Sequence, residues 1–137
     1  MAVRPRTVSA TRADARARLR SAAAYLEVAE LVLEERDRAE FPSVSAGLAV
    51  LAGIAASDSI CAARLHRIHR GQDHREAAML LEGATRDGKT LSRNLRRLLD
   101  IKDAAHYGVN VVSARRARDA VRWADQLTGR AQAETER

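Results

Sequence analysis

Residues 44–69 read VSAGLAVLAGIAASDSICAARLHRIH, and this stretch decides the fold. Large apolar residues recur three and four positions apart, from Val44 through Leu51 and Ile54 to Ile68, which is the spacing of one face of a helix. Glycine and alanine fill many of the other positions, so neighbouring helices can pack closely against this one. The stretch therefore predicts a long, buried helix over about 44–69.

Helical spacing continues on both sides of this central stretch. Thr11 and Asp14 have the spacing of a capping box, which predicts the start of a helix that runs to about Arg38. Asp73 and Ser113 are residues that cap helices well, and each precedes a run with helical spacing. Together these patterns predict an all-α fold, a four- to five-helix up-and-down bundle with one short helix and no strand.

The breaks between the expected helices come from proline, glycine and serine. Pro42 disfavours helix for the residue before it, and Ser43 can cap the helix that follows. Gly71 is expected to end the long central helix. The chain is long enough for one domain, which we place at 12–132, between a mobile basic tail at 1–11 and a frayed end at 133–137.

Composition narrows the class of protein. The 137 residues are 46% apolar but include only four Phe, Trp or Tyr, so the core must be mostly aliphatic and small. The single Cys61 excludes an intramolecular disulfide and, because it lies on the apolar stripe, is expected to be inert core. No apolar run reaches the roughly 18–20 residues of a membrane span. We expect a cytoplasmic protein that needs no cofactor and does not contact membrane.

The charge of the chain is strongly positive. The formal net charge is +6, carried almost entirely by arginine. A basic surface attracts nucleic acid, because phosphates release their counterions when arginine or lysine replaces them. Arg97, Arg115 and Arg116 lie close in sequence to the site described next, so we expect them to contact RNA. The alternative is that most of these charged side chains simply lie on the solvated faces of helices.

Several polar residues gather near the end of the fourth expected helix, at 98–108. The stripe that contains Leu98 also contains Lys102, which places a lysine on the inward face. Asp58 likewise lies on the inward apolar face of the central helix, so we predict an ion pair between Asp58 and Lys102. His106 lies one turn beyond Lys102, and Tyr107 follows it. Lysine and histidine could bind a phosphate and transfer a proton, or simply complement the helix dipole.

The other candidates for chemistry are weaker. His66 and His69 are three residues apart, and His74 follows, but no acid or cysteine joins them at the spacing of a metal site. We therefore expect surface histidines and no metal. Trp123 is expected to pack rather than to stack on a base. The sequence contains none of the common phosphate-binding, nucleophile or zinc-finger motifs.

Two segments carry a resemblance to a known family. Ala55–Cys61, with Asp58, and Leu98–Tyr107, with His106, resemble the HEPN superfamily of small all-α domains over about residues 15–130. The resemblance implies a HEPN-like bundle that forms a homodimer with its sites in a shared cleft. Active members are similar to metal-independent ribonucleases that use an arginine four to six residues before a histidine. Here His106 matches the histidine, but the arginine is missing: Lys102 is the nearest residue in context, and Arg97, the closest arginine upstream, is separated from His106 by eight residues.

Two functions follow as hypotheses. The first is a HEPN-like domain that binds RNA or a nucleotide-linked partner in a dimer cleft, with weak or lost ribonuclease activity. Under this hypothesis the site residues are Asp58, Lys102, His106 and Tyr107, and the partner could be an antitoxin or a nucleotidyltransferase. The second is a non-catalytic module for dimerisation or protein interaction. A DNA-binding helix-turn-helix protein is a weaker third hypothesis, because no helix offers the usual reading face.

Overall fold

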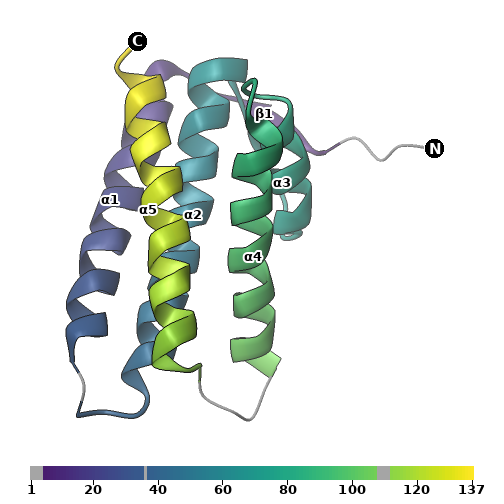
Figure 1. Cartoon of the computed structure of the whole chain (residues 1–137). Helices are drawn as coiled ribbons and strands as arrows, with labels where there is room; N and C mark the ends of the chain where they lie inside the picture. Colours follow the sequence, from purple (N-terminus) through teal and green to yellow (C-terminus); the bar gives the residue numbers. More distant parts are fainter. Residues whose placement is uncertain (1–4, 36, 108–111) are drawn as a thin grey trace.

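In the computed structural model, four long helices lie side by side and alternate in direction (Figure 1). The structure describes residues 5–35, 37–107 and 112–137, without the side chains of 104–107. The long helices are α1 (Arg12–Glu34), α2 (Phe41–Leu65), α4 (Gly88–Tyr107) and α5 (Ala114–Thr135), and the short α3 (His74–Glu82) packs on α4. The predicted all-α bundle is confirmed.

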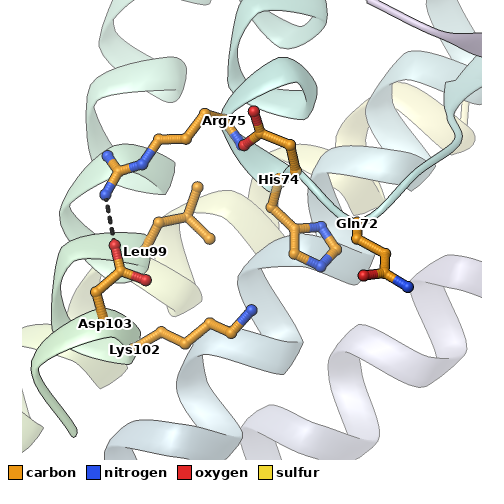
Figure 2. Close-up of a pocket in the computed structure, with 7 residues that line it drawn as sticks. Gln72, His74, Arg75, Leu99, Lys102 and Asp103 are labelled. Atoms are coloured by element: carbon orange, nitrogen blue, oxygen red, sulfur yellow. Dashed lines mark hydrogen bonds and ion pairs between the residues drawn. The ribbon is translucent and has the colours of Figure 1, made fainter. Parts of the chain in front are cut away.

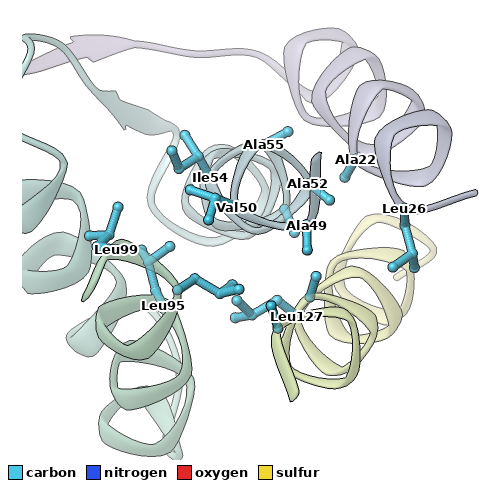
Figure 3. Close-up of a cluster of buried hydrophobic side chains, with 14 of the residues drawn as sticks. Ala22, Leu26, Ala49, Val50, Ala52, Ile54, Ala55, Leu95, Leu99 and Leu127 are labelled. Atoms are coloured by element: carbon cyan, nitrogen blue, oxygen red, sulfur yellow. The ribbon is translucent and has the colours of Figure 1, made fainter. Parts of the chain in front are cut away.

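Helix α2 forms the centre of the bundle and contacts every other helix (Figure 3). Its buried residues include Ala49, Val50 and Ala52, which are at most 2% exposed. Small side chains on α2 let the surrounding helices approach closely, and leucines such as Leu95 and Leu127 fill the space that remains. The core is therefore built by small residues on the central helix and large ones on its neighbours.

Buried serines join the helices by hydrogen bonds to backbone carbonyls. On α2, Ser45 Oγ donates to the carbonyl of Ala29 and Ser59 Oγ to that of Ala15, both at 2.7 Å. A buried hydroxyl without a partner would destabilise the fold by on the order of 1–3 kcal/mol. Because each serine reaches the backbone of α1, these bonds fix how α1 and α2 sit against each other.

A small sheet corrects the prediction that the protein has no strand. Helix α2 ends at Leu65 rather than at Gly71, because His66 adopts a left-handed backbone conformation with φ of 56°. The chain then forms β2 (Arg67–His69), which pairs antiparallel with β1 (Thr7–Ser9). Thr7–Ser9 falls inside the segment 1–11 that we expected to be a mobile tail, and the pairing gives this part of it a fixed backbone partner.

Other helix boundaries also differ from the prediction. Ser43 does not cap α2; it lies inside the first turn, and its hydroxyl accepts a hydrogen bond from the Val112 N–H at 2.8 Å. Helix α1 ends four residues before Arg38. Helix α5 continues to Thr135, so the fraying expected from 133 is not found, because Glu134 is buried and paired with arginines.

Three of the predicted helix starts are confirmed. Thr11 and Asp14 form both hydrogen bonds of a capping box at α1. Asp73 and Ser113 accept backbone N–H groups at the starts of α3 and α5. By length and hydropathy α2 could also cross a membrane, but 72% of its most apolar window is buried inside the bundle, as in the core helix of a globular protein.

Candidate functional site

The predicted ion pair between Asp58 and Lys102 is wrong. Asp58 pairs instead with Arg18 of α1, whose Nη2 lies 3.1 Å from Asp58 Oδ2. Because nearly all of α2 is apolar, its spacing alone does not show which side meets which helix. Leu51, two turns before Asp58 on the same face, is 45% exposed, so this face points out of the bundle toward α1 and solvent.

The Asp58 carboxyl is held at an energetic cost. Burial raises its pKa, and the Arg18 guanidinium and the nearby His69, which both lower it, only partly offset that effect. The Asp58 side chain is 15% exposed and that of Arg18 is 35% exposed. The arrangement is that of a half-buried structural ion pair between α1 and α2.

Lys102 is exposed, whereas the sequence predicted an inward side chain. It lies on the same stripe of α4 as Leu98, but at its level a cavity of about 140 Å³ separates α4 from the start of α3. Figure 2 shows the Lys102 side chain reaching across this space toward His74. The residues that line the cavity are Gln72, Asp73, His74, Arg75, Leu99, Lys102 and Asp103. We call this space the α3–α4 cavity.

Of the three histidines predicted to lie at the surface, His66 is exposed, whereas His69 is buried and His74 is partly buried. The His69 side chain is 3% exposed, and its Nε2 lies 3.2 Å from Glu76 Oε2. The His74 ring lies 6.2 Å from that of His69, centroid to centroid, and its Nδ1 is buried without a hydrogen-bond partner in the described part of the chain. Burial, Lys102 and His69 lower the pKa of His74, and Asp73 raises it by a smaller amount.

Arg75 closes one side of the cavity. Its Nη2 lies 3.0 Å from Asp103 Oδ2 (Figure 2) and 2.7 Å from Asp100 Oδ1, so it ties the start of α3 to α4. The hydrogen bonds that Arg75 donates to both carboxylates raise its pKa. Since two carboxylates neutralise Arg75, Lys102 is the cation of this cavity that an anion could pair with.

The α3–α4 cavity can therefore combine a neutral imidazole with an ammonium group. A histidine with a lowered pKa is free of its proton near pH 7 and can accept one from a bound molecule. Lys102 can hold a small anion beside it. Of the other predicted site residues, the His106 and Tyr107 side chains lie outside the described residues, and Asp58 is not among the residues that line the cavity.

The arginines expected to contact RNA lie on the outer surface of α4 and α5. Arg97, Arg115 and Arg116 are all exposed. The Arg97 guanidinium lies over the ring of Trp123, 5.5 Å from its centroid, and Trp123 is half-buried. Within the described residues, none of these three arginines has a carboxylate within 4.0 Å. Trp123 packs on the core as predicted, but it also supports an arginine at the surface.

Cys61 is buried as predicted, and burial raises the pKa of its thiol to about 12. Such a thiol is unreactive near neutral pH. In the described residues, no three His, Cys, Asp or Glu side chains are placed to bind a metal ion.

The sequence interpretation missed two residues of these polar groups. Arg18 lies four residues before the buried Ala22, so helical spacing places it on the inward face of α1. A charged residue at such a position indicates a partner of opposite charge on the neighbouring helix, which here is α2. His74 was taken as a surface residue because it was grouped with the arginines of 64–70. The sequence signal that could have identified His74 as part of this polar group is its position directly after the cap residue Asp73, at the start of α3.

Comparison with known proteins does not assign the chain. No protein-family model matches it, and a search of curated proteins finds no match. Membership of the HEPN superfamily therefore stays a prediction, based on the residues quoted above.

Proposed function

We propose that this protein is a HEPN-like helical bundle of the cytoplasm that binds single-stranded RNA along the outer faces of α4 and α5. The observation that carries the proposal is the pairing of Arg97 with Trp123 in the middle of a surface rich in arginine. Single-stranded nucleic acid is bound by basic grooves with aromatic or guanidinium planes on which bases stack. Arg97 and Trp123 supply such a plane.

The charges around this plane support the same proposal. Arg93, Arg115 and Arg116 are exposed on the same two helices, and among the described residues no carboxylate lies within 4.0 Å of them. Arginines without protein partners remain available to phosphates. Arg122, by contrast, pairs with Asp119 at 3.2 Å, so we expect it to contribute less.

The direct test is the affinity for a fluorescently labelled single-stranded RNA over a series of salt concentrations. We expect the double variant Arg97→Gln/Arg116→Gln to lose affinity and to reduce the salt slope by about 0.7 per lost phosphate contact. The matched control is Arg16→Gln/Arg20→Gln, which removes the same charge from exposed positions on α1. Equal losses in both variants would show only a general charge effect, and the proposal would fail. Equal binding of single-stranded DNA would remove the preference for RNA.

A second function, dimerisation, is favoured by a separate observation. In the described part of the chain, five of the six exposed large apolar residues belong to α1 and α2, among them Leu31 at 58% and Val44 at 48%. Exposed apolar surface of this kind marks interaction sites. We propose a second copy of the chain as its partner. Leu31→Glu should convert a dimer to a monomer in sedimentation, and a wild-type monomer at high concentration would contradict this.

A further inference from the structure

A group of arginines converges at the end of the bundle where α5 finishes. It is the end at which α2 also finishes and α4 begins, shown at the top of Figure 1. A cavity of about 280 Å³ lies there, and its lining consists of Arg64, Thr85, Arg86, Arg130, Glu134 and Arg137. We call it the arginine cavity. Three separate elements supply its residues, so it exists only in the folded protein.

One buried carboxylate holds these arginines together. The Glu134 side chain is 1% exposed. Arg130 Nε lies 3.1 Å from Glu134 Oε1, and Arg64 Nη1 and Arg137 Nε lie 3.4 and 3.7 Å from Oε2. Arg130 also donates to Asp87 at 2.5 Å, and these hydrogen bonds raise its pKa. The buried glutamate thus places three guanidinium groups around one point.

Positive charge remains in excess in the arginine cavity. Four arginines and one carboxylate line it, and counting Asp87 as well leaves two more cations than anions. Arg64 and Arg137 each approach Glu134 with one nitrogen, while a guanidinium has five N–H groups to donate. In the described part of the chain, Arg86 has no carboxylate within 4.0 Å. The carbonyl ends of α2 and α5 carry partial negative charge and offset part of this excess.

The size of the cavity limits what could fill it. Sites that enclose a drug-sized molecule span roughly 300–1,000 Å³. The arginine cavity is slightly smaller, which suits the phosphates of a nucleotide but not its base and sugar as well. Guanidinium groups bind phosphate through paired, charge-assisted hydrogen bonds.

We propose that the arginine cavity binds an oligophosphate group, carried by a free nucleoside triphosphate or by the 5′ end of an RNA. Arg64, Arg86 and Arg137 donate to phosphate oxygens, and Glu134 fixes the positions of Arg64 and Arg137. This site is separate from the surface around Arg97: along α5, its Arg130 is seven residues beyond Trp123, or about 10 Å. The proposal therefore does not depend on RNA binding by the outer faces of α4 and α5.

The test is calorimetric titration of the wild type with pyrophosphate, in EDTA so that no metal bridges phosphate to Glu134. We expect saturable binding that Arg86→Gln weakens about tenfold, the effect of losing one charge-assisted contact. Arg86 is exposed and has no carboxylate partner among the described residues, so this variant should fold normally. The control Arg20→Gln removes an exposed arginine of α1, outside both proposed binding surfaces, and should bind as the wild type does. Absence of binding, or equal binding by Arg86→Gln, would overturn the proposal.

Two further titrations identify the source of the phosphate. If the ligand is a free nucleotide, ATP should bind at least as tightly as pyrophosphate, and a 5′-triphosphate should not strengthen the binding of an RNA. If it is an RNA end, a 5′-triphosphorylated RNA should bind more tightly than the same RNA with a 5′-hydroxyl, and Arg86→Gln should abolish only that difference. Loss of the difference in Arg97→Gln but not in Arg86→Gln would place the phosphate on the other surface and contradict the proposal.

Discussion

The packing around Gly53 gives a specific prediction. Replacing Gly53 by alanine should lower the free energy of unfolding, whereas the same replacement at another glycine of α2 should raise it. A methyl group added at Gly53 would overlap Leu98 Cδ1 and would lie 3.5 Å from Leu127 Cδ1. Leu98 and Leu127 are fully buried, so they can move only by disturbing other core residues. At Gly47 the added methyl group meets nothing within 4 Å.

The magnitudes follow from two opposing effects. Replacing glycine by alanine inside a helix stabilises by about 1 kcal/mol, and overpacking a core costs about 1–3 kcal/mol. Gly47→Ala should therefore raise the free energy of unfolding by about 1 kcal/mol. Gly53→Ala should lower it by about 1 kcal/mol once both effects are combined. In a domain of this size, the two melting temperatures should differ by about 8 °C.

Urea denaturation of both variants is the assay, with Leu98→Val as a second background. Valine lacks the Cδ1 atom that a new methyl group would strike, so Gly53→Ala should become stabilising when Leu98 is replaced. If Gly53→Ala is as stabilising as Gly47→Ala in the wild-type background, α4 and α5 do not close on α2 as described. The reasoning about the core would then be wrong.

Three further predictions concern charged groups. Arg18→Met should destabilise by about 1 kcal/mol, because it leaves the Asp58 carboxylate unpaired; since burial raises the pKa of Asp58, protonation favours the folded state, and the loss should shrink as urea titrations move from pH 7 to pH 4. An unchanged loss at both pH values would argue against the pair. Glu134→Ala should destabilise by about 2 kcal/mol, less than a fully buried pair, because its arginines reach solvent; a melting temperature within 2 °C of wild type would contradict this. RNA cleavage in EDTA should fall in His106→Ala if the protein is a ribonuclease of the HEPN type, and equal backgrounds in both proteins would remove that activity.

Much of the fold could be predicted from spacing and caps. The start and the buried face of α5 were predicted correctly, because Ser113 gives the start and Ala117, Val121 and Ala124 repeat on one face, all of them buried. The stripe of α4 from Leu91 to Leu98 was equally clear. These helices have one apolar face and one charged face, so periodicity alone decides which side is buried.

The candidate site was harder to predict, because it depends on contacts between helices. Nearly every position of α2 is apolar, so the sequence could not show whether Asp58 faced α1 or α4. Helical spacing places Lys102 on the same stripe of α4 as the buried leucines. The cavity beside it exists only because α3 begins at that level. The small sheet was missed because a left-handed residue, His66, ended α2 early in a place without glycine or proline.

The central claim, that RNA binds across the outer faces of α4 and α5, can be measured with the chain's own fluorescence. Trp123 is the single tryptophan, and it lies directly beneath Arg97. During titration with single-stranded RNA, we expect the tryptophan emission to change in proportion to the RNA bound, and to change less in Arg97→Gln. RNA that binds to saturation while the emission of Trp123 stays constant would contradict the claim.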